Sequence, residues 1–476
     1  MTQENRSGSS RFAIIATLLA FGLVGGISLL LWAITGRVNQ PVRLQTQNGS
    51  IEADSRISEN VRSRVSFGEE SLFPDPSDEK KKGVSAIAQG NYGNAITALN
   101  ASLDDNPNDP ETFIYRNNAR IGNDRALTIA VIAPAAENSE TSLEILRGVA
   151  QAQYDINRYG GIDDVPVKLA LVNDENDSEL AKEIAQTLVQ DPSVLGVVGH
   201  YSSDVTLATI PVYEQGGLVT VSPVSTAVDL SGISPYLYRT VPTDSFAAAA
   251  LAAYMLYYEE DRQAAVFYDS TSDLSSSLKD EFNSFVSAWG GKVVADYDLS
   301  SASFDPQSAT KAEEDGVDTL MIAASPSSLE QAAKVINQNE NRLPVLGGDD
   351  LYNRNLLEQV AGNASALVVA VPWHLLSQDS APEFVSSSRE LWQGDVSWRT
   401  ATAYDAVMSI SMGLKGDPSR EGLKAALDST DFSVDSATGP VNFLPSGDRR
   451  QVDRLVKVEP GTRSGTGFDF VPFTID

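Results

Sequence analysis

The chain of 476 residues contains no cysteine, which excludes disulfide bonds, thiolate metal sites, cysteine nucleophiles and a lipid anchor on an N-terminal cysteine. Its two histidines, His200 and His374, are too few for a multi-histidine metal site. The phosphate-loop pattern GxxxxGK and the catalytic patterns GxSxG and HExxH are also missing. We therefore expect no metal and no cofactor.

The sequence also lacks a convincing catalytic constellation. His200 could act as a base for Ser202 or Ser203, but a catalytic triad needs a base and an orienting group that are positioned separately from the nucleophile. His374, in the stretch VPWHLL, is likewise expected to be structural. We predict that the protein is not an enzyme.

Positive charge is scarce in the larger part of the chain. The formal net charge is -29, and residues 126–476 carry -28 of it. A nucleic-acid partner would require a basic face, so this distribution excludes one. An acidic surface of this kind mainly keeps a protein soluble.

One long uncharged run is present near the N-terminus. Residues 12–34 read FAIIATLLAFGLVGGISLLLWAI, and as a helix they would span about 35 Å, enough for a bilayer. No A-x-A-like cleavage site follows, so we expect residues 1–37 to form an uncleaved membrane anchor. Basic residues flank the run on both sides, which leaves its orientation open. The polar residues 38–78 read as a flexible linker.

A short helical segment is expected at residues 79–122. Apolar residues recur at helical spacing, Gly90 and Asn91 separate two helices, and Pro107 and Pro110 mark the start of a third. The pattern resembles a tetratricopeptide repeat, although one repeat is too little for a solenoid. Residues 81–122 could be a spacer packed on the next domain or a docking site for another protein.

From Ala126 onward, apolar strands alternate with amphipathic helices. Examples are ALTIAVIAP followed by TSLEILRGVAQAQYDINRYG, and a second set that begins near Ser245. Fully apolar strands between such helices predict parallel sheets covered on both faces. The fold class is therefore α/β, with two doubly wound, Rossmann-like lobes in a domain at 126–476.

Hydroxyl and acidic clusters follow several of the predicted strands, in the stretches GHYSS, SPVST, YDSTSD and GGDDLY. Ligands of open α/β sheets bind beyond the carboxyl ends of the strands. These clusters are therefore the expected ligand site.

Residues 126 to about 458 resemble the leucine/isoleucine/valine-binding family, the type I solute-binding proteins of ABC importers. The resemblance rests on RGVAQAQYDINRYGGI, VVGHYSSDVTLATIPVYEQGGLVTVSPVST, AYDAVMSI and ATGPVNFLPSGDRR, in the family's order. It implies two lobes joined by three crossovers that close on a small molecule. Lobe 1 would hold about 126–243 and 374–450, and lobe 2 about 244–373 and 451–476.

The resemblance also implies site residues. Ser202, Ser203, Ser225 and Thr226 would hold the α-carboxylate of the ligand, since hydroxyls and helix N-termini suit an anion. Each could instead be only a helix cap.

On the second lobe, Asp349 would hold the ligand's amine, with Asp350 pointing away because successive side chains of an extended chain alternate. Tyr201 is an aromatic candidate for the cleft wall. One departure is Leu274, which stands where the family commonly has a tyrosine.

Two functions follow from these features. In the first, the chain is a membrane-tethered extracytoplasmic protein that delivers a small zwitterion, such as an amino acid, to an ABC permease. In the second, the same bilobed module is a ligand-sensing receptor or adaptor that docks a partner protein at residues 81–122.

Overall fold

The structure, a computed structural model, describes residues 61–135, 139–258, 262–377 and 380–473. These residues belong to one compact unit. The predicted membrane anchor lies outside them. Among the residues that are described, no helix is both long enough and apolar enough to cross a membrane.

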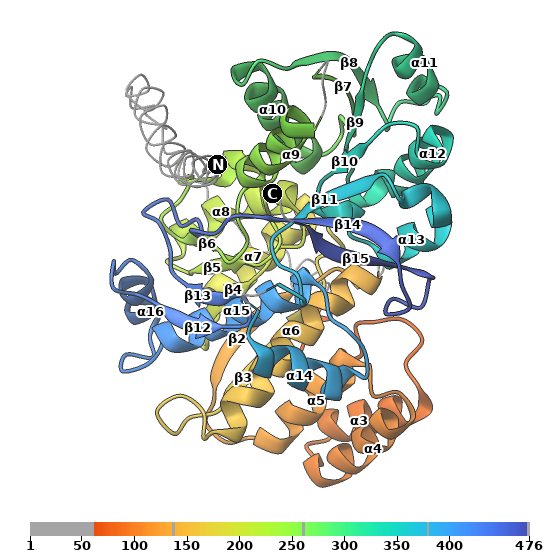
Figure 1. Ribbon diagram of the computed structural model, residues 1–476. Coiled ribbons are helices and arrows are strands. Elements are labelled where there is room, and N and C mark those ends of the chain that lie inside the picture. Colours follow the sequence, from red (N-terminus) through yellow and green to blue (C-terminus); the bar gives the residue numbers. More distant parts are fainter. Residues whose placement is uncertain (1–60, 136–138, 259–261, 378–379, 474–476) are drawn as a thin grey trace, which may run out of the picture. The chain divides into compact units, whose positions relative to one another are not determined.

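Lobe 1 is built on a six-stranded sheet with the strand order β1-β3-β2-β4-β5-β6 (Figure 1). Its strands are β1 (Val65–Ser66), β2 (Leu127–Ile132), β3 (Val167–Val172), β4 (Val194–Val198), β5 (Thr220–Ser222) and β6 (Leu237–Arg239). Strands β2 to β6 pair in parallel. All six residues of β2 are buried, as expected for a parallel strand covered on both faces.

The helices of lobe 1 come from two separate parts of the chain. They are α6 (Ser139–Arg158), α7 (Ser178–Gln190), α8 (Ser203–Gln215), the 3₁₀ turn η1 (Val228–Leu230), α14 (Pro382–Trp392), α15 (Trp398–Gly413) and α16 (Arg420–Leu427), followed by the hairpin β12 (Val434–Ser436) and β13 (Gly439–Val441). Helices α6 and α15 pack directly together. Gly148 makes this contact possible, because a Cβ there would lie 2.1 Å from the carbonyl oxygen of Thr400.

Lobe 2 is built on a seven-stranded sheet with the order β15-β14-β11-β10-β9-β7-β8. Its strands are β7 (Gln263–Tyr268), β8 (Lys292–Asp298), β9 (Thr319–Ala323), β10 (Val345–Gly347), β11 (Leu367–Val371), β14 (Arg454–Pro460) and β15 (Phe468–Phe473). Strands β7 to β11 are parallel, and the C-terminal pair β14 and β15 adds to the β11 edge in antiparallel fashion (Figure 1).

The helices of lobe 2 alternate with its parallel strands. They are α9 (Asp244–Tyr258), α10 (Asp273–Ala288), α11 (Ser308–Glu314), the 3₁₀ turn η2 (Pro326–Ser328), α12 (Leu329–Asn339), η3 (Asp349–Leu351), α13 (Arg354–Val360) and η4 (Ala361–Ala364). The chain passes between the lobes at 240–243, between β11 and α14, and at 442–453, which makes three crossovers. Apart from β1, each sheet lies within the ranges predicted for its lobe.

The C-terminal part of the predicted flexible linker, residues 61–78, contacts lobe 1. Within residues 61–78, Val61 is buried and β1 pairs antiparallel with β3, with Val65 opposite Val172. A polar sequence without apolar period predicted a tether. A single two-residue strand is too short to produce a periodic pattern, which is why the sequence did not reveal it.

The predicted helical segment consists of α3 (Asp78–Ala88), α4 (Tyr92–Asp105) and α5 (Pro110–Ile121), and Asn91 and Asp109 cap the second and third helices. The segment packs on lobe 1 through α5, next to the domain predicted to begin at 126. The amide of Asn118 in α5 donates to the carbonyl oxygen of Leu169 in β3 at 2.7 Å and accepts from its N–H at 3.2 Å. The resemblance to a tetratricopeptide repeat stays a prediction.

Candidate functional site

The carboxyl ends of the parallel strands of both lobes border a small chamber of about 40 Å³. Lobe 1 contributes residues from the β4–α8 and β5 loops and the start of α15, and lobe 2 contributes residues from the β7–α10 loop, η2 and η3. The lining residues are Thr141, Tyr201, Ser202, Ser203, Asp204, Val224, Ser272, Leu274, Pro326, Asp349, Asp350, Trp398 and Arg399. The predicted residues Tyr201, Ser202, Ser203 and Asp349 are therefore brought together.

The two serines at the start of α8 differ in what their hydroxyls do. Ser202 is the N-cap of the helix, and its Oγ accepts from the N–H of Val205 at 3.3 Å. Ser203 is 2% exposed, and its Oγ accepts from the N–H of Ala227 at 3.3 Å, which ties the β4–α8 loop to the β5 loop. Ser202 thus has the capping role that was the alternative to ligand binding.

The predicted pair Ser225 and Thr226 is not brought into this chamber. Ser225 is fully buried in lobe 1, where its Oγ lies 2.8 Å from the Oγ1 of Thr206. Thr226 lines a neighbouring cavity of about 10 Å³ at the first crossover, together with Asp244 and Asp349. The Oγ1 of Thr226 is buried and has no hydrogen-bond partner among the described residues.

The surroundings of His200 do not suit a catalytic base. His200 is fully buried, its Nδ1 lies 2.7 Å from the Oδ2 of Asp174, and its Nε2 lies 3.0 Å from the hydroxyl of Tyr213. Both ring nitrogens are therefore engaged inside lobe 1. Within the described part of the chain, no three His, Asp or Glu side chains are grouped so that they could hold a metal ion.

Asp349 and Asp350 both face the chamber, so the expectation that only one of them would do so is wrong. The reason is local: the two residues form the 3₁₀ turn η3, whereas the alternation of side chains applies to an extended chain. They are 9% and 8% exposed. Burial raises the pKa of Asp349 well above its ordinary value, and the charge of Asp350 raises it further.

Arg399, in the first turn of α15, is the residue that sequence reasoning missed. Its Nη2 donates to the Oδ1 of Asp350 at 2.6 Å, and its Nη1 lies 3.9 Å from the Oε2 of Glu144 in α6. Burial raises the pKa of Asp350, while the charge of Arg399 opposes this rise. The sequence did contain a signal for Arg399. A cation in the first turn of a helix opposes the helix dipole, so an arginine at that position is expected to have another role.

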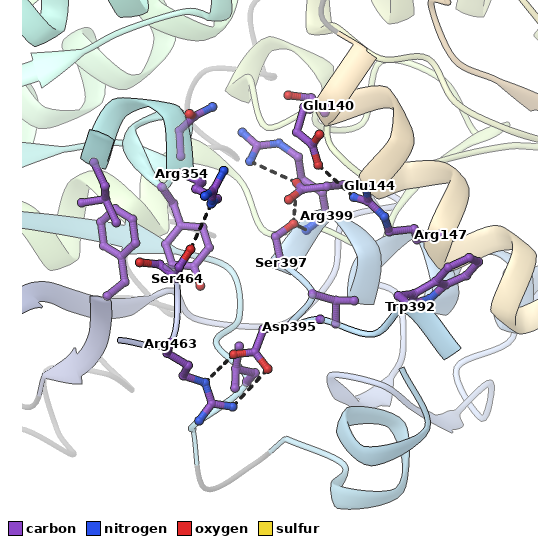
Figure 2. A pocket seen from close by; sticks show the side chains of 18 of the residues that line it. Glu140, Glu144, Arg147, Arg354, Trp392, Asp395, Ser397, Arg399, Arg463 and Ser464 are labelled. Atoms are coloured by element: carbon purple, nitrogen blue, oxygen red, sulfur yellow. Dashed lines mark hydrogen bonds and ion pairs between the residues drawn. The ribbon is translucent and has the colours of Figure 1, made fainter. Parts of the chain in front are cut away.

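A second, larger chamber of about 490 Å³ lies beyond Arg399, also between the lobes (Figure 2). It shares Thr141 and Arg399 with the small chamber. Lobe 1 lines it with Asn108, Glu140, Glu144, Arg147, Trp392, Gly394, Asp395, Val396 and Ser397; lobe 2 and the crossovers line it with Tyr352, Asn353, Arg354, Asn355, Leu357, His374, Leu375, Arg463, Ser464, Asp469 and Phe470.

Ion pairs and hydrogen bonds organise the wall of this larger chamber. Arg463, in the β14–β15 loop of lobe 2, binds both carboxylate oxygens of Asp395, in the α14–α15 loop of lobe 1 (Figure 2). On α6, Arg147 donates from Nε to the Oδ1 of Asn108 at 2.7 Å and from Nη1 to the Oε1 of Glu140 at 3.1 Å. The chamber therefore lies between two ion pairs that join the lobes, at Arg399 and at Arg463.

His374 at the second crossover is buried, and its Nδ1 accepts from the N–H of Leu376 at 3.2 Å. Burial, together with the charge of Arg463, lowers the pKa of His374 to about 4. The imidazole is therefore neutral at neutral pH, and it forms part of the chamber wall.

Residues 126–459 match the periplasmic binding protein family over more than half of the chain. The chain belongs to the periplasmic binding protein family. The leucine-specific-binding protein of Salmonella typhimurium is 23% identical over 334 residues, which are 68% of this chain and 87% of that protein.

Two solved structures of ABC transporter binding proteins share the fold. The ABC transporter substrate-binding protein of Desulfitobacterium hafniense in complex with Leu has a TM-score of 0.60 at 21% identity, and the match covers 73% of this chain and 100% of that one. A solute-binding protein of an ABC transporter from Rhodopseudomonas palustris in complex with 3,4-dihydroxybenzoic acid has a TM-score of 0.62 at 18% identity, covering 73% and 96%. The fold is therefore shared by proteins with chemically different ligands.

Proposed function

We propose that this periplasmic binding protein is the solute-binding component of an ABC importer and closes its lobes around a small zwitterion such as an amino acid. The observation that carries the proposal is the small chamber, in which Asp349 of lobe 2 faces the N-terminus of α8 at Ser203 of lobe 1. A helix N-terminus favours a carboxylate, and a buried carboxylate favours an ammonium group. The two charges of an amino acid would thus be held by different lobes, which favours closure.

Unsatisfied hydrogen-bonding groups support a polar ligand. Three such atoms are the Oδ2 of Asp350 and the Nε1 of Trp398, two residues of the small chamber, and the Oγ1 of Thr226, a residue of the neighbouring cavity. All three atoms are buried and have no hydrogen-bond partner among the described residues. Buried polar groups of folded proteins are nearly always hydrogen-bonded. The three unpaired atoms therefore suit a ligand that has both hydrogen-bond donors and acceptors.

The membrane anchor at residues 1–37, the extracytoplasmic location of the lobes and the ABC permease partner are parts of the same proposal. The support for the anchor is the uncharged run at 12–34, which is long enough to span a bilayer. The support for the permease is the family, since the matched solved structures include substrate-binding proteins of ABC transporters. Leu274, which lines the small chamber, replaces the tyrosine expected from the resemblance and favours a ligand with an apolar part.

Calorimetric titration of the whole chain with a panel of the twenty amino acids tests the binding proposal. We expect at least one of them to bind with a dissociation constant in the micromolar range or below, and heats of binding that are absent with the corresponding amine lacking the carboxylate. Uptake of the same radiolabelled amino acid by cells with and without the gene tests transport. Loss of uptake is expected when the gene is deleted.

The receptor or adaptor function remains the second candidate because of one contact. Asn108, in the loop between α4 and α5, accepts a hydrogen bond from Arg147, which lines the larger chamber. A ligand between the lobes would therefore touch a residue that is bonded to the helical segment. Ligand-dependent capture of a partner protein by the whole chain, lost when surface residues of α3 and α4 are substituted, would favour this function over transport.

A further inference from the structure

The two chambers are connected by one helix face. On α6, Thr141 lines both chambers, Glu144 lies beside Arg399 at their boundary, and Arg147 lines the larger chamber alone. These residues are three apart, so they lie on one side of the helix and span about 9 Å along its axis. The site therefore continues past the position at which a single amino acid would end.

The sizes of the chambers favour a longer ligand. The small chamber measures about 40 Å³ and the larger one about 490 Å³. Each residue of an extended chain adds about 3.3–3.6 Å. An extended peptide ligand of three residues is therefore about as long as the stretch of α6 from Thr141 to Arg147.

The chemistry of the larger chamber matches a peptide better than an apolar side chain. Four arginines face four acidic side chains in its lining, so the wall is balanced in formal charge. Three asparagines, Asn108, Asn353 and Asn355, offer both donors and acceptors. An apolar group placed against such a wall would leave polar atoms unpaired, whereas peptide groups donate and accept in the same way as the asparagine amides.

The charges at the two ends have the order that a zwitterionic peptide requires. Asp349 lines the small chamber and not the larger one, and the buried Arg147 lines the larger chamber and not the small one. Among the described residues, the hydrogen bonds of Arg147 use Nε and Nη1, which leaves Nη2 for a further acceptor. Asn108 holds the guanidinium in place, so the helical segment contributes a positioning residue to the site.

We propose that the cleft takes a di- or tripeptide, with its N-terminal ammonium group at Asp349 and its C-terminal carboxylate at Arg147. The inference rests on the proposed solute-binding function and specifies its ligand class. Arg399 borders both chambers, whereas Asp350 lines only the small one. A peptide that extends from one chamber into the other would pass Arg399 and separate it from Asp350.

Calorimetry on the whole chain tests the proposal with leucine, leucyl-glycyl-glycine and the C-terminally amidated tripeptide as probes. We expect the tripeptide to bind about tenfold or more tightly than leucine, because it gains charged hydrogen bonds. Arg147→Met should weaken the tripeptide by about tenfold or more while leaving leucine and the amidated tripeptide nearly unchanged. Arg342→Met, in lobe 2 away from both chambers, is the matched control and should change none of the three affinities.

A second variant covers the case in which Arg147→Met does not fold. Gly394 lines the larger chamber, and a Cβ there would meet nothing closer than the Trp392 carbonyl oxygen at 3.9 Å. Gly394→Phe should therefore fold, reduce the volume of the chamber and abolish tripeptide binding while leucine still binds.

Leucine binding at least as tight as the tripeptide, or equal weakening of both probes in these variants, would overturn the peptide inference and leave the proposed function intact. Failure of every amino acid and peptide probe to bind would contradict the proposed function as well.

Discussion

Arg399 of lobe 1 and Asp350 of lobe 2 form an ion pair of 2.6 Å across the cleft, with side chains that are 5% and 10% exposed. The pair stands between the two chambers and joins the lobes where a ligand would lie. An ion pair this deeply buried contributes little net stability by comparison with apolar packing, but breaking it leaves one charge unpaired. A change in the cleft that separates Arg399 from Asp350 would therefore lower the stability of the closed arrangement of the lobes.

A double-mutant cycle on this pair tests that link. Arg399→Met should lower the free energy of unfolding by about 3–5 kcal/mol, because it leaves Asp350 without a counter-charge, and Asp350→Asn should lower it by less, because Glu144 still lies 3.9 Å from Arg399. The double variant should be clearly more stable than the sum of the two losses predicts, since no charge is then left alone. Urea denaturation of the three variants provides the measurement, and strict additivity would show that the two residues do not interact.

The hydroxyls that are predicted to bind a carboxylate give a second prediction. It compares the effect of each substitution on the free energy of unfolding with its effect on ligand affinity. Thr226→Ala should leave the free energy of unfolding nearly unchanged, since its Oγ1 has no partner, whereas Ser203→Ala should lower it by about 1 kcal/mol through the lost bond from Ala227. Both should weaken the binding of a single amino acid such as leucine by about 1–3 kcal/mol if the hydroxyls hold its carboxylate. Unchanged calorimetric affinity in both variants would restrict these residues to a structural role.

Truncation tests the boundary of lobe 1. A chain that begins at Val61 should melt at the same temperature as the whole chain, because β1 and α5 stay in place on β3. A chain that begins at Ala126 loses both and exposes the side of lobe 1 that they cover, so it should melt at a markedly lower temperature or precipitate. Thermal unfolding followed by circular dichroism decides the matter, and equal melting temperatures would show that the helical segment is dispensable.

Asp244 at the first crossover predicts a pH dependence of stability. Burial raises its pKa to about 6, whereas an unfolded aspartate titrates near about 3.9. The folded protein thus holds a proton that the unfolded chain releases, so the stabilising contribution of this group is full below about pH 4 and is lost as the pH rises through about 6.

Asp244→Asn removes this titration. The variant should gain at most about 3 kcal/mol relative to the natural chain at pH 7 and nothing at pH 4. Urea denaturation across that pH range provides the test. The same pH slope in both proteins would exclude Asp244 as its source.

The sequence predicted the features that arise from local patterns. The alternation of apolar strands and amphipathic helices predicted both sheets, and residues of the strand-end clusters GHYSS and GGDDLY line the same chamber, as the topology of open α/β sheets leads one to expect. The helical segment was also predicted, since glycine, asparagine and proline mark its breaks.

Features that depend on contacts between distant segments were not predictable in the same way. The distance from Asp350 to Arg399 and from Asn108 to Arg147 follows from how lobe 2 and the helical segment pack on lobe 1, and no single stretch of sequence encodes it. The orientation of Asp350 was wrongly predicted because a 3₁₀ turn replaces the extended chain at that point. Ser225 was implied as a site residue by the family resemblance, whereas in the structure its Oγ lies 2.8 Å from the Oγ1 of Thr206 inside lobe 1.

The most direct test of the account is mass spectrometry of the small molecules released from the whole chain by mild denaturation, compared between the natural protein and Asp349→Asn. Loss of one member of a buried charge pair should weaken binding by more than about a hundredfold. Asp435→Asn, an exposed carboxylate in β12, is the control. The account predicts a molecule with an ammonium and a carboxylate group from the natural chain and the control, and its absence from Asp349→Asn. A bound molecule without an amine, or equal amounts from all three proteins, would contradict it.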